Sequence, residues 1–368
     1  MQGEQRAPAG PTGPPDAAAV KQRARALGFD LCGIAEAGAL DGRPLRAWLG
    51  AGMDAGMKYM RERVEERLDP RVLLPGARSV IVLAASYGPE GAARRRSDSV
   101  TESVSVSESV TASASASVTP LTIARYAQGR DYHNVLLKPA RKLAAWLRTH
   151  GAQVYAEVDA GAVAEKAWAQ RAGLGWIGKN GMLINQAFGS WLLLGALVTD
   201  LALAPDAPEE DRCGECAACL PACPTDAIQA GRLIDARRCL AFHTIEHRGP
   251  IPEALAAKAG GRLFGCDACQ EACPWNRRAR PATLVQLRSN QTQRALALED
   301  ALALTPSETE RRFGGTPLMR AGRDGLVRSA LALAPRPLSG TARTLAERLR
   351  TDSAEGVRIE AERALRGT

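Results

Sequence analysis

The chain contains few aromatic residues and no long hydrophobic run. Only 4% of its 368 residues are Phe, Trp or Tyr. No stretch of eighteen uncharged apolar residues occurs, so we expect no membrane span. The N-terminal "MQGEQRAPAGPTGPPD" lacks the apolar core of a signal peptide. We therefore expect a disordered leader, residues 1–15, and a cytoplasmic protein. Hydrophobic residues still make up 45% of the chain, enough for two or three packed domains.

Cysteine is what this sequence does have, and it is concentrated. Four of the nine cysteines fall in "CGECAACLPACP", Cys213 to Pro224. In a reducing compartment, thiols this dense indicate metal binding or catalysis rather than disulfides. The spacing C-x2-C-x2-C-x3-C-P is that of bacterial ferredoxins, where three cysteines hold one 4Fe–4S cluster and the fourth ligates a second. "CDACQEACP", from Cys266, repeats the ending without the first cysteine, and Cys239 can supply it.

Crossed ligation of two 4Fe–4S clusters follows from these spacings. We expect cluster one to be held by Cys213, Cys216, Cys219 and Cys273, and cluster two by Cys223, Cys239, Cys266 and Cys269. Cys32 is left over and reads as a small buried hydrophobe in a strand. Structural zinc is the alternative, because Cys239, His243 and His247 could share one helix face. Zinc does not explain the duplicated ending, so iron–sulfur is favoured and the two histidines are expected on the helix surface or facing RNA.

Upstream of the cysteines, predicted strands alternate with helices. "ARSVIVLAASYG" and "GSWLLLGALVTD" read as buried strands, and a long amphipathic helix ends at Gly151. This order favours an α/β or α+β domain. A Ser/Val/Thr block, residues 97–120, could not build a core and is predicted to be a disordered surface insertion.

The C-terminal quarter is basic and helical. From Arg277 to Thr368 there are 17 Arg, no Lys and 10 acidic residues, which places +7 of the chain's formal charge of +8 there. "RDGLVRSALALA" and "EGVRIEAERALR" resemble each other 31 residues apart, a period that suits stacked helical repeats. An anionic partner is indicated, with nucleic acid first; the alternative is an ordinary solvated helix face.

One motif is misleading. "GLGWIGKN", Gly173 to Asn180, matches G-x-G-x-x-G, but a nucleotide site needs these glycines to follow a strand and open a helix. Here they close a predicted helix, residues 165–172, and Asn180 replaces the hydroxyl that a phosphate loop requires. We therefore reject nucleotide binding.

Asp159 ends the predicted strand "VYAEVD", and on position alone it is best read as the N-cap of the next helix. A wider resemblance changes this interpretation. The segments "RLDPRVLLPGARSVIV", "ARYAQGRDYHNVL", "VDAGAVAEKAWAQRAGLGWIGKN" and "RRCLAFHTIEHRG", together with the crossed cysteines, resemble epoxyqueuosine reductase over about residues 17–332, the Ser/Val/Thr block excluded.

That resemblance implies a cobalamin- and iron–sulfur-dependent enzyme of tRNA modification. Such an enzyme reduces the epoxide of epoxyqueuosine, at the wobble position of certain tRNAs, to the cyclopentene of queuosine. Two electrons and two protons enter and one water leaves. Cobalamin would lie over the N-terminal domain close to the first cluster, with Asp159 as proton donor. The positions that match the family's cobalamin contacts are Arg67, Ala124, Asp159, Leu183, Leu194 and Asp267.

Physical arguments agree with both implied roles. A free Asp has a pKa near 3.9, and burial under a mostly apolar corrin would raise it and keep a proton available. A tRNA anticodon stem-loop is a polyanion that the Arg-rich tail could hold. Two departures affect the acid: "DAGA" replaces the family's "DTGP" from Asp159, and Lys166 replaces an Arg. The hydrogen bonds of the missing Thr are lost.

We thus expect an α+β protein of three domains. These are an α/β cobalamin-binding catalytic domain (16–205), a ferredoxin-type two-cluster domain (206–285) and a HEAT-like helical-repeat domain that binds tRNA (286–368). A monomer is expected, served by an unidentified low-potential electron donor and not attached to a membrane. The alternatives are a cobalamin and iron–sulfur reductase of a small molecule such as a dehalogenase, a dicluster electron carrier, and an RNA-binding module with structural clusters.

Overall fold

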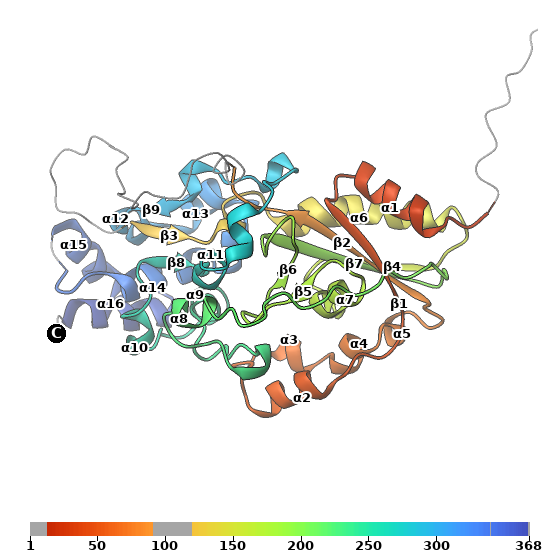
Figure 1. Cartoon of the computed structure of the whole chain (residues 1–368). Coiled ribbons are helices and arrows are strands. Elements are labelled where there is room, and N and C mark those ends of the chain that lie inside the picture. Colours follow the sequence, from red (N-terminus) through yellow and green to blue (C-terminus); the bar gives the residue numbers. More distant parts are fainter. Residues whose placement is uncertain (1–12, 91–119, 339, 367–368) are drawn as a thin grey trace, which may run out of the picture.

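The computed structural model describes residues 13–90, 120–338 and 340–366 (Figure 1). Nearly all of the predicted leader, and the Ser/Val/Thr insertion up to residue 119, lie outside these ranges. Within them, no helix is both long and apolar enough to cross a membrane.

The first sheet has four strands in the order β1-β2-β7-β4, and all neighbouring pairs are antiparallel. Its strands are β1 (Leu31–Glu36), β2 (Ser79–Ser86), β7 (Leu192–Thr199) and β4 (Val154–Glu157). The α/β label predicted for this domain is therefore wrong, and the domain is α+β. Continuous apolar runs usually mark parallel strands covered on both faces; here an antiparallel sheet is covered on both faces and gives the same runs.

Two layers cover this sheet. Helices α1 (Ala17–Ala26) and α6 (Tyr132–Arg148) pack on the face that carries Ile81 and Leu83. Helix α7 (Glu165–Arg171) packs on the face of Val80 and Val82, beside the hairpin of β5 (Trp176–Ile177) and β6 (Leu183–Ile184). Alternate residues of β2 thus belong to different cores, as the two-residue period of a strand requires.

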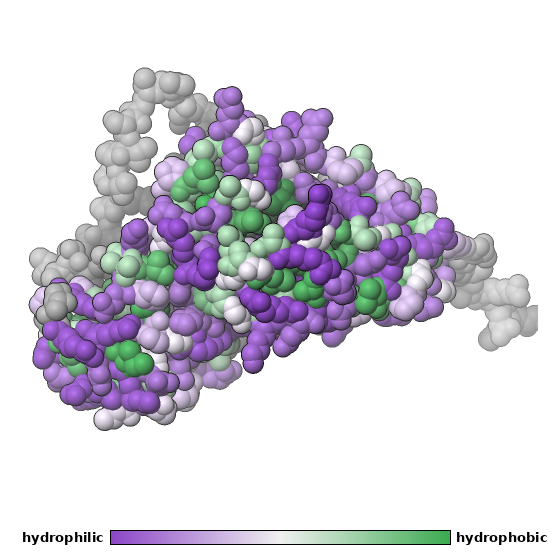
Figure 2. Space-filling model, turned by 90° about the horizontal axis from the view of Figure 1, so that it is seen from below, coloured by the Kyte–Doolittle hydropathy of each residue, from purple (hydrophilic) through white to green (hydrophobic). Residues whose placement is uncertain are grey.

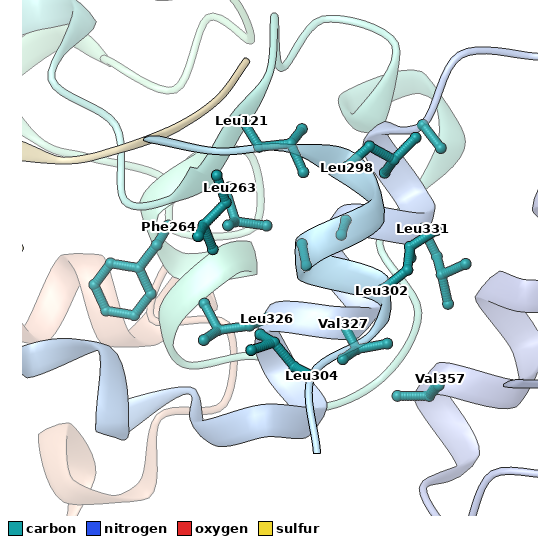
Figure 3. Packing of buried hydrophobic residues seen from close by; sticks show 14 of the residues in the cluster. Leu121, Leu263, Phe264, Leu298, Leu302, Leu304, Leu326, Val327, Leu331 and Val357 are labelled. Carbon is teal, nitrogen blue, oxygen red and sulfur yellow. The ribbon is translucent and has the colours of Figure 1, made fainter. Parts of the chain in front are cut away.

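A second sheet joins distant parts of the chain. Strand β3 (Leu121–Ile123) lies between β8 (Arg262–Phe264), which is parallel to it, and β9 (Ala295–Leu296), which is antiparallel. Their apolar side chains share one core with α12 (Leu298–Leu302), α14 (Gly322–Leu333) and α16 (Glu355–Arg366) (Figure 3). This core crosses the boundaries predicted at 205/206 and 285/286, which stay predictions.

The C-terminal segment is helical, as expected. Its remaining elements are α13 (Pro306–Phe313), the 3-10 helix η7 (Pro317–Arg320) and α15 (Gly340–Leu349). The two similar sequence segments form α14 and α16, which pack against each other. A HEAT-like arrangement stays a prediction.

Short elements complete the chain between these layers. On the lower side of Figure 1 lie α2 (Arg43–Gly50), α3 (Lys58–Arg61), α4 (Val64–Leu68) and α5 (Pro70–Leu73). The cysteine region contains α8 (Cys219–Ala222), α9 (Leu240–Ile245), α10 (Glu253–Ala256) and α11 (Ala268–Glu271). The other 3-10 turns are η2 (Arg125–Ala127), η3 (Ala230–Arg232), η4 (Pro274–Arg278), η5 (Val285–Leu287) and η6 (Gln291–Gln293).

Candidate active site

The four cysteines predicted for cluster one are neighbours in the structure. Burial raises the pKa of the Cys219 thiol, and the nearby thiols of Cys213 and Cys216 raise it further. Burial also raises the pKa of Cys273, with Cys213 and Cys219 again contributing. Cys216 is exposed and Cys273 is buried, so this set runs from the surface into the protein.

The other four cysteines form the second predicted set. Burial raises the pKa of Cys269, and the thiols of Cys266, Cys239 and Cys223 add to the effect. Cys219 of the first set also acts on Cys269, so the two sets are adjacent. Both groupings agree with the crossed arrangement expected from the spacing, while ligation itself stays a prediction.

One thiol of the second set accepts a backbone hydrogen bond. The backbone N–H of Ala227 donates to Cys223 Sγ at 3.2 Å, the kind of bond that tunes iron–sulfur clusters. Across the described ranges, no three His, Cys, Asp or Glu side chains converge closely enough to hold one ion. His243 Nε2 contacts the carbonyl of Arg237 at 2.8 Å, and His247 Nε2 that of Pro250 at 3.2 Å.

The expectation that both histidines lie on the helix surface or face RNA is wrong for His243. Its side chain is buried, 5% exposed, because α9 packs that face against the C-terminal helices. Burial also lowers the pKa of His243, so the ring is a packed structural group and not an RNA contact.

The glycine motif that resembles a phosphate loop has a different role. It follows α7 and enters β5, and no helix opens after it, which agrees with the rejection of nucleotide binding. Lys179, within the motif, donates from Nζ to the carbonyls of Gly214 at 2.8 Å and Cys216 at 2.9 Å. It therefore braces the exposed loop that carries the first cysteines. The sequence analysis missed this residue, because nothing in the local sequence indicates which loop the lysine reaches.

The loop that carries Asp159 follows β4 and is shaped by Glu157. The buried Glu157 carboxylate accepts hydrogen bonds from the backbone N–H of Ala162 at 3.1 Å and Val163 at 2.6 Å. A Cβ on Gly161 would lie 1.5 Å from a carboxylate oxygen of Glu157. Only glycine fits there, which explains the Gly of "DAGA".

Asp159 itself is not a helix cap. The N-cap of α7 is Ala164, which makes no side-chain hydrogen bond, so the interpretation from position alone is wrong. Asp159 has a φ of +56°, in the left-handed region that costs a non-glycine residue energy and is frequent at functional sites. Its N–H donates to Glu165 Oε1 at 2.8 Å, which holds this conformation.

Asp159 faces the start of α6, where three polar residues converge. Its Oδ2 accepts a hydrogen bond from the hydroxyl of Tyr132 and lies 3.3 Å from His133 Nε2. His133 Nδ1 lies 2.8 Å from Asp131 Oδ1. Asp131 also caps α6 by accepting from the N–H of His133 at 3.0 Å. The cap thus fixes a chain of groups from Asp131 through His133 to Asp159. In the sequence, the local signal for this cap was "DYH", which places an Asp directly before a helix.

The protonation states of these hydrogen-bonded side chains differ from what the sequence suggested. Burial raises the pKa of Asp159, but hydrogen bonds from His133 and Tyr132 outweigh it and hold the value below its usual range. The hydrogen bonds of His133 to Asp131 and Asp159 raise its pKa to about 9. At neutral pH the proton therefore resides on His133, and Asp159 is ionised.

Asp159 and Lys166 are open to solvent and yet closely surrounded by protein. Asp159 is 55% exposed and Lys166 is exposed, yet burial is the largest influence on the pKa of both. We infer that both side chains lie in a concave part of the surface, which we call the cleft. Burial lowers the pKa of Lys166, whereas the negative charges of Asp159, Glu165 and Cys269 raise it. The cleft therefore lies near a cysteine of the second set.

The positions predicted to contact cobalamin fall in several local environments. Ala124 and Asp267 line a cavity of about 320 Å³ together with Cys266. Burial raises the pKa of Asp267 to about 6. Leu183 and Leu194 pack on the α7 face of the first sheet.

The remaining contact, Arg67, donates from Nη2 to the carbonyl of Tyr59 at 2.9 Å. The Tyr126 hydroxyl lies near both Asp159 and Asp267, because the negative charges of both raise its pKa. Within the described residues, the buried Nε atoms of Arg67 and Arg125 have no hydrogen-bond partner. Buried unpaired donors at these positions fit a large cofactor with polar edges.

Comparisons with known proteins agree with this site. A family described as a 4Fe-4S double cluster binding domain matches residues 212–276, and one described as epoxyqueuosine reductase QueG, DUF1730, matches residues 67–160. An epoxyqueuosine reductase of Gloeobacter violaceus is 42% identical over 326 residues, which cover 86% of this chain and 95% of that protein. One from Xanthomonas campestris pv. campestris is 38% identical over 94% of each chain.

Solved structures agree as well. A crystal structure of epoxyqueuosine reductase with a tRNA-Tyr epoxyqueuosine-modified tRNA stem loop superposes with a TM-score of 0.77 at 26% identity, covering 94% of this chain and 97% of that one. The structure from Streptococcus thermophilus gives a TM-score of 0.75 at 25% identity with the same coverage. This chain belongs to the epoxyqueuosine reductase family of oxidoreductases, and its cofactors are two 4Fe–4S clusters and cobalamin.

Proposed function

We propose that this chain reduces epoxyqueuosine to queuosine at the wobble position of tRNA, with Asp159 as the residue that delivers the proton. The observation that carries the proposal is the hydrogen-bonded chain of Asp131, His133 and Asp159 on the wall of a cleft near Cys269. Reductive opening of an epoxide needs electrons and a proton at one place. Membership of the family names the substrate.

The protein's own residues hold and move the proton. As the C–O bond of the epoxide breaks, the oxygen would leave as a costly alkoxide unless an acid protonates it. His133 carries a proton at neutral pH and lies 3.3 Å from Asp159 Oδ2. We infer that Asp159 takes this proton as bound cofactor and substrate bury it and raise its pKa. Cobalamin, when bound, would supply a strongly nucleophilic cobalt centre.

The two cysteine sets would hold the two clusters, which would supply the electrons. Cys216 is exposed, so cluster one is the side open to a low-potential donor. Cys269 and Asp159 both lie close enough to Lys166 to raise its pKa. We therefore propose that cluster two is the one next to cobalamin. The resemblance had suggested the first cluster, and the contacts favour the second. Arg67, Ala124, Leu183, Leu194 and Asp267 would hold the cobalamin.

The partner we propose is the anticodon stem-loop of tRNA. A related structure contains such a stem loop, and the tail from Arg277 onward carries the basic charge that phosphates require. We also propose a cytoplasmic location, because reduced thiols are needed for the clusters. The protein is further proposed to be a monomer.

The test is turnover in defined conditions. The protein is purified without oxygen, reconstituted with iron, sulfide and cobalamin, and given a strong reductant and tRNA carrying epoxyqueuosine. Mass spectrometry of nucleosides should show queuosine with the parent. Asp159→Asn, which keeps the shape but cannot deliver a proton, should lower the rate by about 100-fold or more with cluster and cobalamin content unchanged. A variant that turns over like the parent would remove Asp159 from the mechanism.

A further inference from the structure

An exposed tyrosine lies outside the roles described so far. Among the described residues, the large apolar side chains that are exposed are Tyr59, Val72, Leu220, Val285 and Met319. Tyr59 is the one aromatic residue among them, 43% exposed. Aromatic rings usually bury their large apolar faces, and an exposed ring is typical of a binding surface.

The segment that carries Tyr59 is fastened on both sides. Arg67 Nη2 donates to the carbonyl of Tyr59 at 2.9 Å. Earlier in the same segment, Trp48 Nε1 donates to the carbonyl of Ile234 at 2.7 Å, and the carbonyl of Met53 accepts from the N–H of Ala236 at 2.8 Å. The exposed ring therefore stands on a fixed support, and little order has to be gained on binding.

The hydroxyl of Tyr59 lies near charged groups from several segments of the chain. After burial, which raises the pKa of its hydroxyl and keeps the phenol neutral, the charges that act on it are those of Glu246, Arg320, Asp159 and Arg67. Arg320 makes a two-pronged ion pair with Glu246, at 3.0 and 2.8 Å. Arg320 belongs to η7 in the basic tail and Glu246 follows α9, so three parts of the chain meet beside the ring.

The surface on this side suits a planar, partly apolar ligand. Figure 2 looks at the side along which α2 and α3 run, and hydrophobic residues gather in its middle between hydrophilic ones. Arg67, which is expected to contact cobalamin, touches the main chain of Tyr59, and the Tyr59 hydroxyl donates to Met57 Sδ at 2.9 Å, so neither hydrogen bond uses a face of the ring. A nucleobase, which has two aromatic faces, matches such a ring better than a corrin does.

We propose that Tyr59 is the platform on which the wobble base stacks when the anticodon loop presents it to the cleft. The inference rests on the proposed function for its ligand, and names a contact that positions the nucleotide. Proteins that read single-stranded RNA splay bases out and stack them on aromatic side chains. Arg320, from the basic tail, would bring the flanking backbone close to the same point.

The test uses binding rather than turnover. The probe is an anticodon stem-loop with 2-aminopurine, whose fluorescence reports stacking, at the wobble position. The holoenzyme should change this fluorescence on binding. Tyr59→Ala should abolish the change and weaken binding about 5- to 150-fold, the range for losing one stacked base. Tyr59→Phe should bind like the parent, and Val72→Ala is the exposed apolar control that should have no effect.

Salt dependence and cofactor content separate stacking from other causes. Tyr59→Ala should shift log K without changing its slope against log[salt], because no phosphate contact is lost. Tyr59→Leu, apolar without an aromatic face, should behave like Tyr59→Ala while retaining clusters and cobalamin. Parent-like fluorescence with Tyr59→Ala would overturn the proposal, as would loss of cobalamin with RNA binding intact. Turnover of epoxyqueuosine is measured separately, so the two proposals fail independently.

Discussion

Single residues in this cleft act through their neighbours. Asp159 is held in a left-handed conformation by the carboxyl of Glu165 and ionised by His133. His133 owes its raised pKa to its hydrogen bonds with Asp131 and Asp159. A substitution at one member therefore changes the protonation of the others, and pH becomes the most direct probe.

The proton store can be tested at His133. Because its pKa in the folded protein is about 9, the parent's turnover should fall as pH rises through that value. At pH values below the ordinary histidine pKa near 6.5, the ion pair contributes its full stabilisation to the fold. That stabilisation should be lost as pH rises from there through about 9. His133→Gln should lower turnover by about 100-fold and remove the alkaline decline, as measured by initial rates from neutral pH upward.

His150→Gln, at the other end of α6, is the matched control for losing an imidazole. It should keep both the rate and the pH profile of the parent. An unchanged alkaline decline in His133→Gln would assign that titration to another group.

Glu165 gives a prediction about stability. Burial raises its pKa from 4.5 to about 8, so in this interval the unfolded chain releases a proton that the folded protein keeps. Stability should therefore decline as pH rises from 4.5 to 8. Glu165→Gln can still accept from the N–H of Asp159 and removes this penalty. Relative to the parent, it should gain about 1–3 kcal/mol between pH 5 and pH 8.

Thermal unfolding of both proteins at the two pH values measures that gain. Glu362→Gln, on the exposed side of α16, reports what the loss of one surface carboxylate does by itself. If Glu165→Gln differs from the parent by the same amount at both pH values, the carboxyl is ionised in the folded state.

At the scale of elements, Lys179 braces the loop that carries the first cysteines of cluster one. Lys179→Met keeps the stem but loses both hydrogen bonds to the carbonyls of Gly214 and Cys216. Hydrogen bonds from charged donors contribute about 1.5–3 kcal/mol each, so the loop should open more often. The visible absorbance of the clusters should bleach several-fold faster with a chelator, while Lys142→Met, at an exposed position of α6, should bleach like the parent.

Such contacts mark the limit of what the sequence could predict. The cysteine sets could be inferred because ligand spacing is local and the duplicated ending requires a partner. The helices α14 and α16 followed from their repeated pattern. The brace from Lys179 to the loop of Gly214 and Cys216, and the approach of His133 to Asp159, could not be inferred, because each depends on which loops the fold brings together. The cap that joins Asp131 to His133 is local and left its signal in "DYH". The antiparallel sheet was hidden because both of its faces are buried.

At the scale of the whole molecule, the arrangement of the cores joins segments that sequence reasoning had separated. Strand β3 comes from the N-terminal part, β8 from the cysteine region and α14 from the basic tail, and they share one core (Figure 3). Arg328 of α14 strengthens this union: it is 2% exposed and donates to the carbonyls of His243 and Gly249. The tail that would hold tRNA is thus packed against the region that follows Cys239.

Cooperative unfolding is the expected consequence. Leu326, fully buried in this core, loses packing on substitution by Ala, which should cost about 2–5 kcal/mol. Because the core includes β8, which immediately precedes Cys266, the loss should appear in far-UV circular dichroism and in cluster absorbance at the same denaturant concentration. Leu143→Ala, in the separate core between α6 and the first sheet, provides the comparison.

A shift of circular dichroism alone in Leu326→Ala would mean that the tail unfolds independently, and the predicted boundary at 285/286 would then be a true domain boundary. Coincident shifts would mean that RNA-binding surface, cluster region and cleft are stabilised as one unit, so that a substitution in the tail weakens the binding of the clusters.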